Sequence, residues 1–335
     1  MKNGCVVIKE TDMYYVSFGH GRKNLIVLPG LSDGLATVKG KALFLKTPYK
    51  RFLNEYTVYM FSRKNNMPEG YTIRHMAEDQ AFAMKELGIG KAAVLGVSQG
   101  GMVAQYLAID HPELVEKLIL AVTAPYANDV VKDAVGSWIG MAKQEDHVRL
   151  MVDTAERMYS KAYLDKNRKL FPVMARFTKP HRYERFFRNA CAIMDFDARE
   201  ELSRIGCPTL IIAGDDDNTV GNDAPYELND CIPDSKVYIY HGLGHGLFEE
   251  AKDFYDRVYK CTLGLPGSIT SLIRPMYSGS KTSAAVSTGS PWPVRSCSRA
   301  RRRIRPTSTT SRAGSWTPTQ LLRFCLTSPV RPAGG

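Results

Sequence analysis

One short stretch of the sequence, residues 91–109, constrains the fold of this chain more than any other. An apolar segment leads into Gly96-Val97-Ser98-Gln99-Gly100 and then into a segment of helical composition. A serine on so sharp a strand-to-helix turn needs neighbours without side-chain bulk two positions away, because the backbone folds back on itself there. Gly96 and Gly100 meet this need. The stretch therefore predicts a buried strand, a Ser98 hydroxyl lifted clear of the sheet and a helix beginning at Gln99.

Apolar runs and helical segments alternate along most of the chain, which indicates a parallel sheet covered by helices. The run at 24–28 is apolar on both faces, as a strand buried between two helical layers requires. The expected fold class is α/β, with a mostly parallel sheet covered by helices on both faces. Strands are expected within 4–18 as a hairpin and over 24–28, 57–61, 91–97, 115–122, 207–214 and 236–240, and helices over 73–87, after Ser98, over 224–229 and over 247–259.

The alternation stops between residues 130 and 203. No strand-like run occurs there, whereas apolar and aromatic residues recur at helical intervals among many charges. We expect a helical cap at 130–203, inserted between an N-terminal core part, 1–129, and a C-terminal core part, 204–263. The methionines and aromatic residues of the cap are compatible with an apolar acyl pocket and with ordinary packing.

Candidate partners for Ser98 follow later strands. Three adjacent acids, Asp215, Asp216 and Asp217, come after the strand at 207–214, and His245 lies between two glycines after the last strand. Adjacent carboxylates are also compatible with a metal site, but no histidine or cysteine lies near them in the sequence, so no metal is expected. His241 ends the last strand, and we interpret it as structural.

On these motifs, residues 24 to about 262 resemble a capped, esterase-like serine hydrolase of the α/β-hydrolase superfamily. The matching motifs are Gly-Val-Ser-Gln-Gly-Gly at 96–101, Gly-Asp-Asp-Asp at 214–217 and Gly-His-Gly at 244–246, and their order of serine, acid and histidine is the one expected in this superfamily. The resemblance implies that Ser98 is the nucleophile, that His245 is the base, and that Asp217 orients the base.

The resemblance also implies an oxyanion hole made of two backbone N–H groups. One belongs to Gln99, at the start of the helix after the serine. The other belongs to Leu31, in the turn that follows the strand at 24–28. Members of the superfamily often carry His-Gly in this turn, whereas this chain has Pro29-Gly30. A backbone donor survives that change, but the change leaves open the geometry of the loop and any role of the imidazole.

The implied activity is hydrolysis of a small carboxylic ester or a related acyl substrate through an acyl-enzyme, without a cofactor. These motifs do not specify the substrate. A carbon–carbon bond hydrolase or an aminopeptidase of the same fold would reuse the same three residues. A ligand-binding protein could retain them without catalysing any reaction.

Basic charge is concentrated at the end of the sequence. Residues 1–256 hold 32 of the 45 basic and all 34 acidic side chains, so neither nucleic acid nor a membrane is an expected partner of the core. Residues 264–335 lack Asp, Glu and His, contain ten arginines against one lysine, and are rich in Ser, Thr, Pro and Gly. This composition predicts a disordered tail foreign to the hydrolase, with an anion-binding arm around Arg299–Arg305 as the alternative.

The seven cysteines are odd in number and form no Cys-x-x-Cys pair, which favours reduced thiols. The first ten residues are interrupted by charge before any apolar stretch reaches the length of a signal peptide. A cytoplasmic location is therefore expected. The sequence makes no prediction about oligomeric state.

Overall fold

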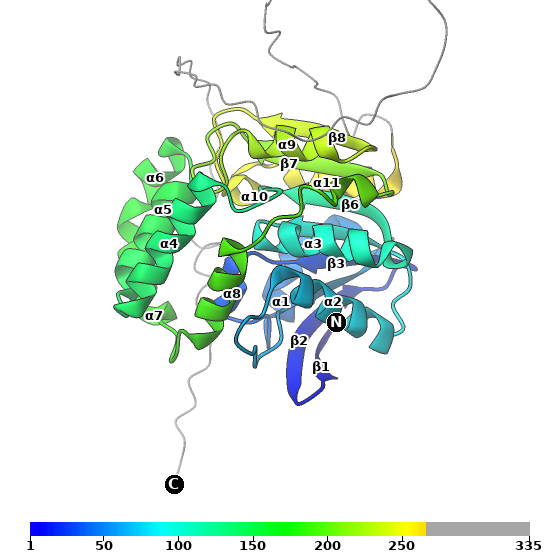
Figure 1. The fold of residues 1–335 in the computed structure, drawn as a ribbon, viewed down its shortest axis with the longest axis horizontal. Coiled ribbons are helices and arrows are strands. Elements are labelled where there is room, and N and C mark those ends of the chain that lie inside the picture. Colours follow the sequence, from blue (N-terminus) through cyan, green and yellow to red (C-terminus); the bar gives the residue numbers. More distant parts are fainter. Residues whose placement is uncertain (266–335) are drawn as a thin grey trace, which may run out of the picture.

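The computed structural model describes residues 1–265, and the predicted basic tail lies almost wholly outside this range. Eight strands form one sheet in the order β1-β2-β4-β3-β5-β6-β7-β8 (Figure 1). Strands β1 and β2 form an antiparallel hairpin, β2 is antiparallel to β4, and all other neighbours are parallel, so the α/β fold class predicted from the sequence is confirmed. The strands are β1 Lys2–Ile8, β2 Thr11–Gly19, β3 Lys23–Leu28, β4 Tyr56–Phe61, β5 Ala92–Val97, β6 Val115–Ala121, β7 Thr209–Gly214 and β8 Ser235–Tyr240.

Helices cover both faces of the sheet because successive residues of each central strand point to opposite sides. In β3, Ile26 and Leu28 pack in the cluster that contains α2, α3 and α9, whereas Leu25 and Val27 pack with η2, α10 and α11. These helices are α2 Ile73–Glu86, α3 Gln99–Asp110, α9 Ala224–Cys231, α10 Leu247–Glu250 and α11 Phe254–Leu263, with short α1 Ala42–Leu45 and the 3₁₀ turns η1 Leu31–Gly34, η2 Thr47–Phe52, η3 Pro112–Leu114 and η5 Leu202–Arg204.

The chain between β6 and β7 is helical, and we call its helices α4–α8 the cap. Figure 1 shows α4–α7 as a group to one side of the sheet, with α8 between this group and the core. Helix α8 contacts both α4 and η1, so it links the cap to the turn after β3. Within residues 1–265 no helix is long and apolar enough to cross a bilayer. The cap comprises α4 Asp129–Lys143, α5 His147–Met158, α6 Lys161–Asn167, η4 Arg168–Leu170, α7 Phe171–Thr178 and α8 Glu184–Met194.

One predicted element is wrong in detail. The single helix expected over 247–259 is two helices, α10 and α11, separated by an extended Ala251 with φ −79° and ψ 114°. Leu247 in α10 and Phe254 in α11, on either side of the break, are both fully buried in the same apolar cluster.

Candidate active site

Ser98 lies on the turn between β5 and α3 in a strained conformation, with φ 55° and ψ −121°. The turn is possible only because its neighbours are glycines. A Cβ atom on Gly100 would lie 1.9 Å from the carbonyl oxygen of Leu28, and one on Gly96 would lie 2.5 Å from the carbonyl oxygen of Gly100. The backbone N–H of Ser98 also donates to Ala121 on β6 at 2.9 Å, which fixes the serine at the carboxyl end of the sheet.

The structure brings together the three residues that the sequence singled out at the ends of β5, β7 and β8. His245 Nε2 lies 2.9 Å from Ser98 Oγ, and His245 Nδ1 lies 2.9 Å from Asp217 Oδ2. The histidine is 4% exposed and the aspartate 3%, so their pairing is shielded from water. In this arrangement the imidazole bridges a hydroxyl and a carboxylate, as proton transfer from the hydroxyl requires.

The three adjacent acids have different partners. Asp217 Oδ1 accepts hydrogen bonds from the N–H groups of Thr219 and Val220 at 2.9 and 3.0 Å, which leaves Oδ2 aimed at the histidine. Asp215 instead pairs with His241 at 2.7 Å on the exposed surface. Among residues 1–265, no group of three or more acidic, histidine or cysteine side chains is arranged to hold a metal ion.

Both predicted oxyanion donors are at helix N-termini near the serine. Leu31 is the first residue of η1, and Gln99 is the first residue of α3. Such N–H groups have no acceptor within their own helix, and neither is bonded to a backbone carbonyl in the turns, loops and caps of residues 1–265. A Cβ atom on Gly30 would lie 3.3 Å from Ser98 Cβ, so the turn that carries Leu31 lies directly against the serine.

A buried charged cluster, Asp33, Arg63 and Arg185, lies behind this turn and was not predicted. The Arg63 side chain donates to the carbonyl oxygen of Pro29 at 2.7 Å, and its backbone N–H donates to Asp33 Oδ2 at 2.8 Å. Arg185 Nη2 donates to the same carboxylate oxygen at 2.6 Å. Burial lowers the pKa of Arg63 to about 10, although Asp33 opposes this shift. In the sequence, the one sign of this cluster is that Arg63 closely follows the strand expected at 57–61.

A second contact joins the cap to the segment after His245. Tyr159 donates to Glu249 Oε2 at 2.8 Å, and Ser160 donates to Glu250 from both its backbone N–H and its hydroxyl, at 3.1 and 2.5 Å. Burial raises the pKa of Glu249 to about 7, with a smaller contribution from the neighbouring Glu250 carboxylate. The cap is therefore held against α10 by groups that include a buried titratable acid.

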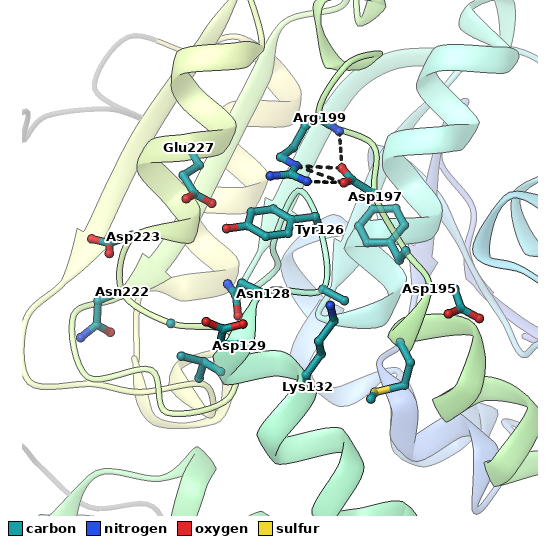
Figure 2. A pocket seen from close by; sticks show the side chains of 15 residues that line it. Tyr126, Asn128, Asp129, Lys132, Asp195, Asp197, Arg199, Asn222, Asp223 and Glu227 are labelled. Carbon is teal, nitrogen blue, oxygen red and sulfur yellow. Dashed lines mark hydrogen bonds and ion pairs between the residues drawn. The ribbon is translucent and has the colours of Figure 1, made fainter. Parts of the chain in front are cut away.

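A cavity of about 590 Å³ lies between the start of α4, the segment 194–199 and α9. Figure 2 shows the side chains that line it. Five of its fifteen lining residues are acidic and two are basic. The Arg199 guanidinium lies 3.9 Å from the centre of the Tyr126 ring and donates to Asp197 at 2.9 Å. Ser98 and His245 do not line it. It adjoins the site through two lining residues: the Asn222 side chain accepts the backbone N–H of Asp217 at 2.8 Å, and the Gly221 N–H donates to the Asp217 carbonyl oxygen at 3.1 Å.

Comparisons with known proteins agree with this fold. The family model described as "alpha/beta hydrolase fold" matches residues 54–252. The AB hydrolase superfamily protein YisY of Bacillus subtilis is 31% identical over 193 residues, which covers 55% of this chain and 71% of that protein.

Two solved structures share the fold. The first is MGS-M2, an alpha/beta hydrolase from a Medee basin deep-sea metagenome library, with a TM-score of 0.68 and 19% identity over 82% of this chain and 100% of that one. The second is the enol-lactonase of Burkholderia xenovorans LB400, with a TM-score of 0.65 and 21% identity over 77% of this chain and 98% of that one.

Proposed function

This chain belongs to the alpha/beta hydrolase fold family and is a hydrolase, and we propose that it is a serine hydrolase of small carboxylic esters or related acyl substrates. The observation that carries the proposal is the hydrogen-bonded line from Asp217 through His245 to Ser98, with 2.9 Å at each step. A serine in a strained conformation, with a glycine two positions away on each side and a buried histidine in contact with its hydroxyl, is the arrangement that activates a hydroxyl as a nucleophile.

The proposed reaction has two acyl-transfer steps. His245 accepts the Ser98 proton at Nε2 while the serine oxygen attacks the substrate carbonyl, and it then delivers this proton to the leaving group. Asp217 holds the imidazole in the tautomer that accepts at Nε2 and stabilises its charged form. The N–H groups of Leu31 and Gln99 bind the oxyanion. Water, activated by the same histidine, then hydrolyses the acyl-enzyme.

The site supplies every group that the proposed reaction needs from this chain's own residues. It does not distinguish esters from thioesters, amides or carbon–carbon bonds next to a carbonyl, since all of them pass through a tetrahedral oxyanion at Ser98. The substrate class is therefore a question for direct assay.

The test is a parallel assay of the full chain against p-nitrophenyl esters of increasing acyl length, acyl thioesters, aminoacyl p-nitroanilides and a vinylogous 1,5-diketone. We expect multiple turnovers on short esters, and a loss of at least about 10³-fold in kcat for Ser98→Ala. Ser137→Ala, which changes a serine of α4 without a hydrogen bond to the site, is the matched control. Turnover confined to the anilides or the diketone would replace the ester assignment, and a lack of turnover on every substrate would favour a binding protein.

A further inference from the structure

The turn after β3 is held by arginines from two different parts of the chain. Arg63, which follows β4, binds the Pro29 carbonyl oxygen at 2.7 Å and the Asp33 carboxylate at 2.8 Å. Arg185, on cap helix α8, binds the same carboxylate at 2.6 Å and also donates to the Asp33 carbonyl oxygen and, at 2.8 Å, to that of Arg63. Leu31 lies between the two anchored residues of the turn, so its N–H is fixed from both sides.

The second oxyanion donor is tied to the same turn of α8. The Gln99 side chain donates to the carbonyl oxygen of Asn189 at 2.8 Å. Asn189 in turn donates to the carbonyl oxygen of Arg185 at 2.8 Å, four residues earlier in the helix. The contact is close, because a Cβ atom on Gly34 would lie 3.0 Å from the Cα atom of Phe186.

The hydrogen bonds between Arg185 and Asp33 are shielded from water, because both side chains are largely buried. Asp33 is 3% exposed, and the side chain of Arg185 is 14% exposed. A charged hydrogen bond shielded from water is stronger than one on the surface, and removing one partner leaves the other buried and unpaired. Without Arg185, the Asp33 carboxylate would keep only the Arg63 N–H, and the turn would lose its charged hydrogen bonds to the cap.

We propose that Arg185 is a positioning residue for the oxyanion hole, through which the cap helix α8 sets the geometry of the Leu31 and Gln99 donors. The inference rests on the proposed function, since it concerns the same site. Oxyanion donors act only within about 2.7–3.1 Å of the developing charge. A shift of α8 therefore moves both donors together, and the hole is complete only when the cap is docked on the core.

The variants that test this are Arg185→Gln, Arg185→Lys and Arg188→Gln. Arg188 is the matched control, because it lies on the same helix and, among residues 1–265, pairs only with Glu184 at its surface. Arg185→Gln is expected to lower kcat by about 10- to 100-fold with KM changed less than about 3-fold, since displaced donors weaken transition-state binding. Lysine keeps the charge but cannot form all three bonds, so Arg185→Lys is expected to lie between wild type and Arg185→Gln. Arg188→Gln should match the wild type.

The rate at which a fluorophosphonate probe labels Ser98 is measured beside kcat, because the phosphonyl oxygen uses the same donors. Slower labelling of Arg185→Gln with a wild-type Tm supports the proposal, and an unchanged labelling rate overturns it. If Arg185→Gln does not fold, the labelling rate and Tm of Arg185→Lys are compared with those of the wild type by the same criterion. A wild-type chain that the probe does not label at Ser98 would refute the proposed function instead, which keeps the two failures apart.

Discussion

The backbone N–H of Gly246 donates to the carbonyl oxygen of Met158 at 2.7 Å, which joins the turn carrying His245 to the end of cap helix α5. The cap also lies close to Gly244, on the other side of His245. A Cβ atom on Gly244 would lie 2.9 Å from the same Met158 oxygen and 2.7 Å from the carbonyl oxygen of Asp216, next to Asp217. The glycines that flank the histidine therefore allow the cap, the base and the acid to meet.

Gly244→Ala should lower both activity and stability, because the added methyl group meets two backbone oxygens that cannot move without displacing the acid or the cap. We expect a fall in kcat of at least about 10-fold, as for other small misplacements of catalytic groups, together with a lower Tm. Gly140→Ala is the control, since nothing lies within 4 Å of a Cβ atom there and it sits in α4. Equal Tm and kcat for wild type and Gly244→Ala would contradict this account of the turn.

Substitutions of the acids after β7 should differ sharply in their effect on kcat. Asp217→Asn is expected to reduce kcat by roughly 10³- to 10⁴-fold, because the amide no longer fixes the imidazole tautomer. Asp215→Asn changes an exposed carboxylate paired with His241 and should leave kcat within a few-fold of wild type. Steady-state kinetics on one ester measure both variants. A larger loss of kcat for Asp215→Asn than for Asp217→Asn would assign the role of the acid to Asp215 instead.

Local sequence signals singled out Ser98, the three acids at 215–217 and His245, because each follows a strand and is marked by a glycine or a turn, and the family resemblance selected Asp217 among the acids. The same signals cannot find partners that only tertiary packing brings together. The contact between Asp33 and Arg185 spans 152 positions and depends on how α8 docks on the turn. Neither residue belongs to a motif, and the charges of α8 look like those of any exposed helix in the sequence.

The break in the helix after His245 has no local signal either. The local pattern favours one helix over 247–259, whereas the structure has an extended Ala251 after α10, with Phe254 of α11 buried in the same apolar cluster as Leu247. Pro29 is a partial exception. The sequence showed that no imidazole is present in the turn, but only the structure shows Arg63 bonded to the Pro29 carbonyl oxygen at 2.7 Å.

Glu249 should make stability depend on pH. Its folded pKa of about 7 lies above its ordinary value of 4.5, so the folded state binds more protons than the unfolded state between these values. Stability therefore falls as pH rises from about 4.5 to 7, where the buried carboxyl group must ionise.

Glu249→Gln removes this ionisation and keeps an acceptor for the Tyr159 hydroxyl. We expect its Tm to match that of wild type at pH 4.5 and to exceed it at pH 8, as followed by circular dichroism. Glu86→Gln, on the exposed face of α2, is the control for loss of a negative charge. A Tm difference that does not change with pH would show that Glu249 titrates normally in the folded chain.

A chain that stops after Leu265 should keep the Tm and the hydrolase activity of the full chain. Residues 1–265 contain all eight strands, the cap, Ser98, Asp217 and His245. The last helix of this range, α11, ends at Leu263. A second truncation, after Asp253, is the matched control: it also removes α11, whose Phe254 and Val258 are fully buried, and should abolish soluble folded protein. Thermal unfolding and ester turnover are measured for all three chains. Loss of folding already in the chain ending at Leu265 would mean that residues beyond it stabilise the hydrolase.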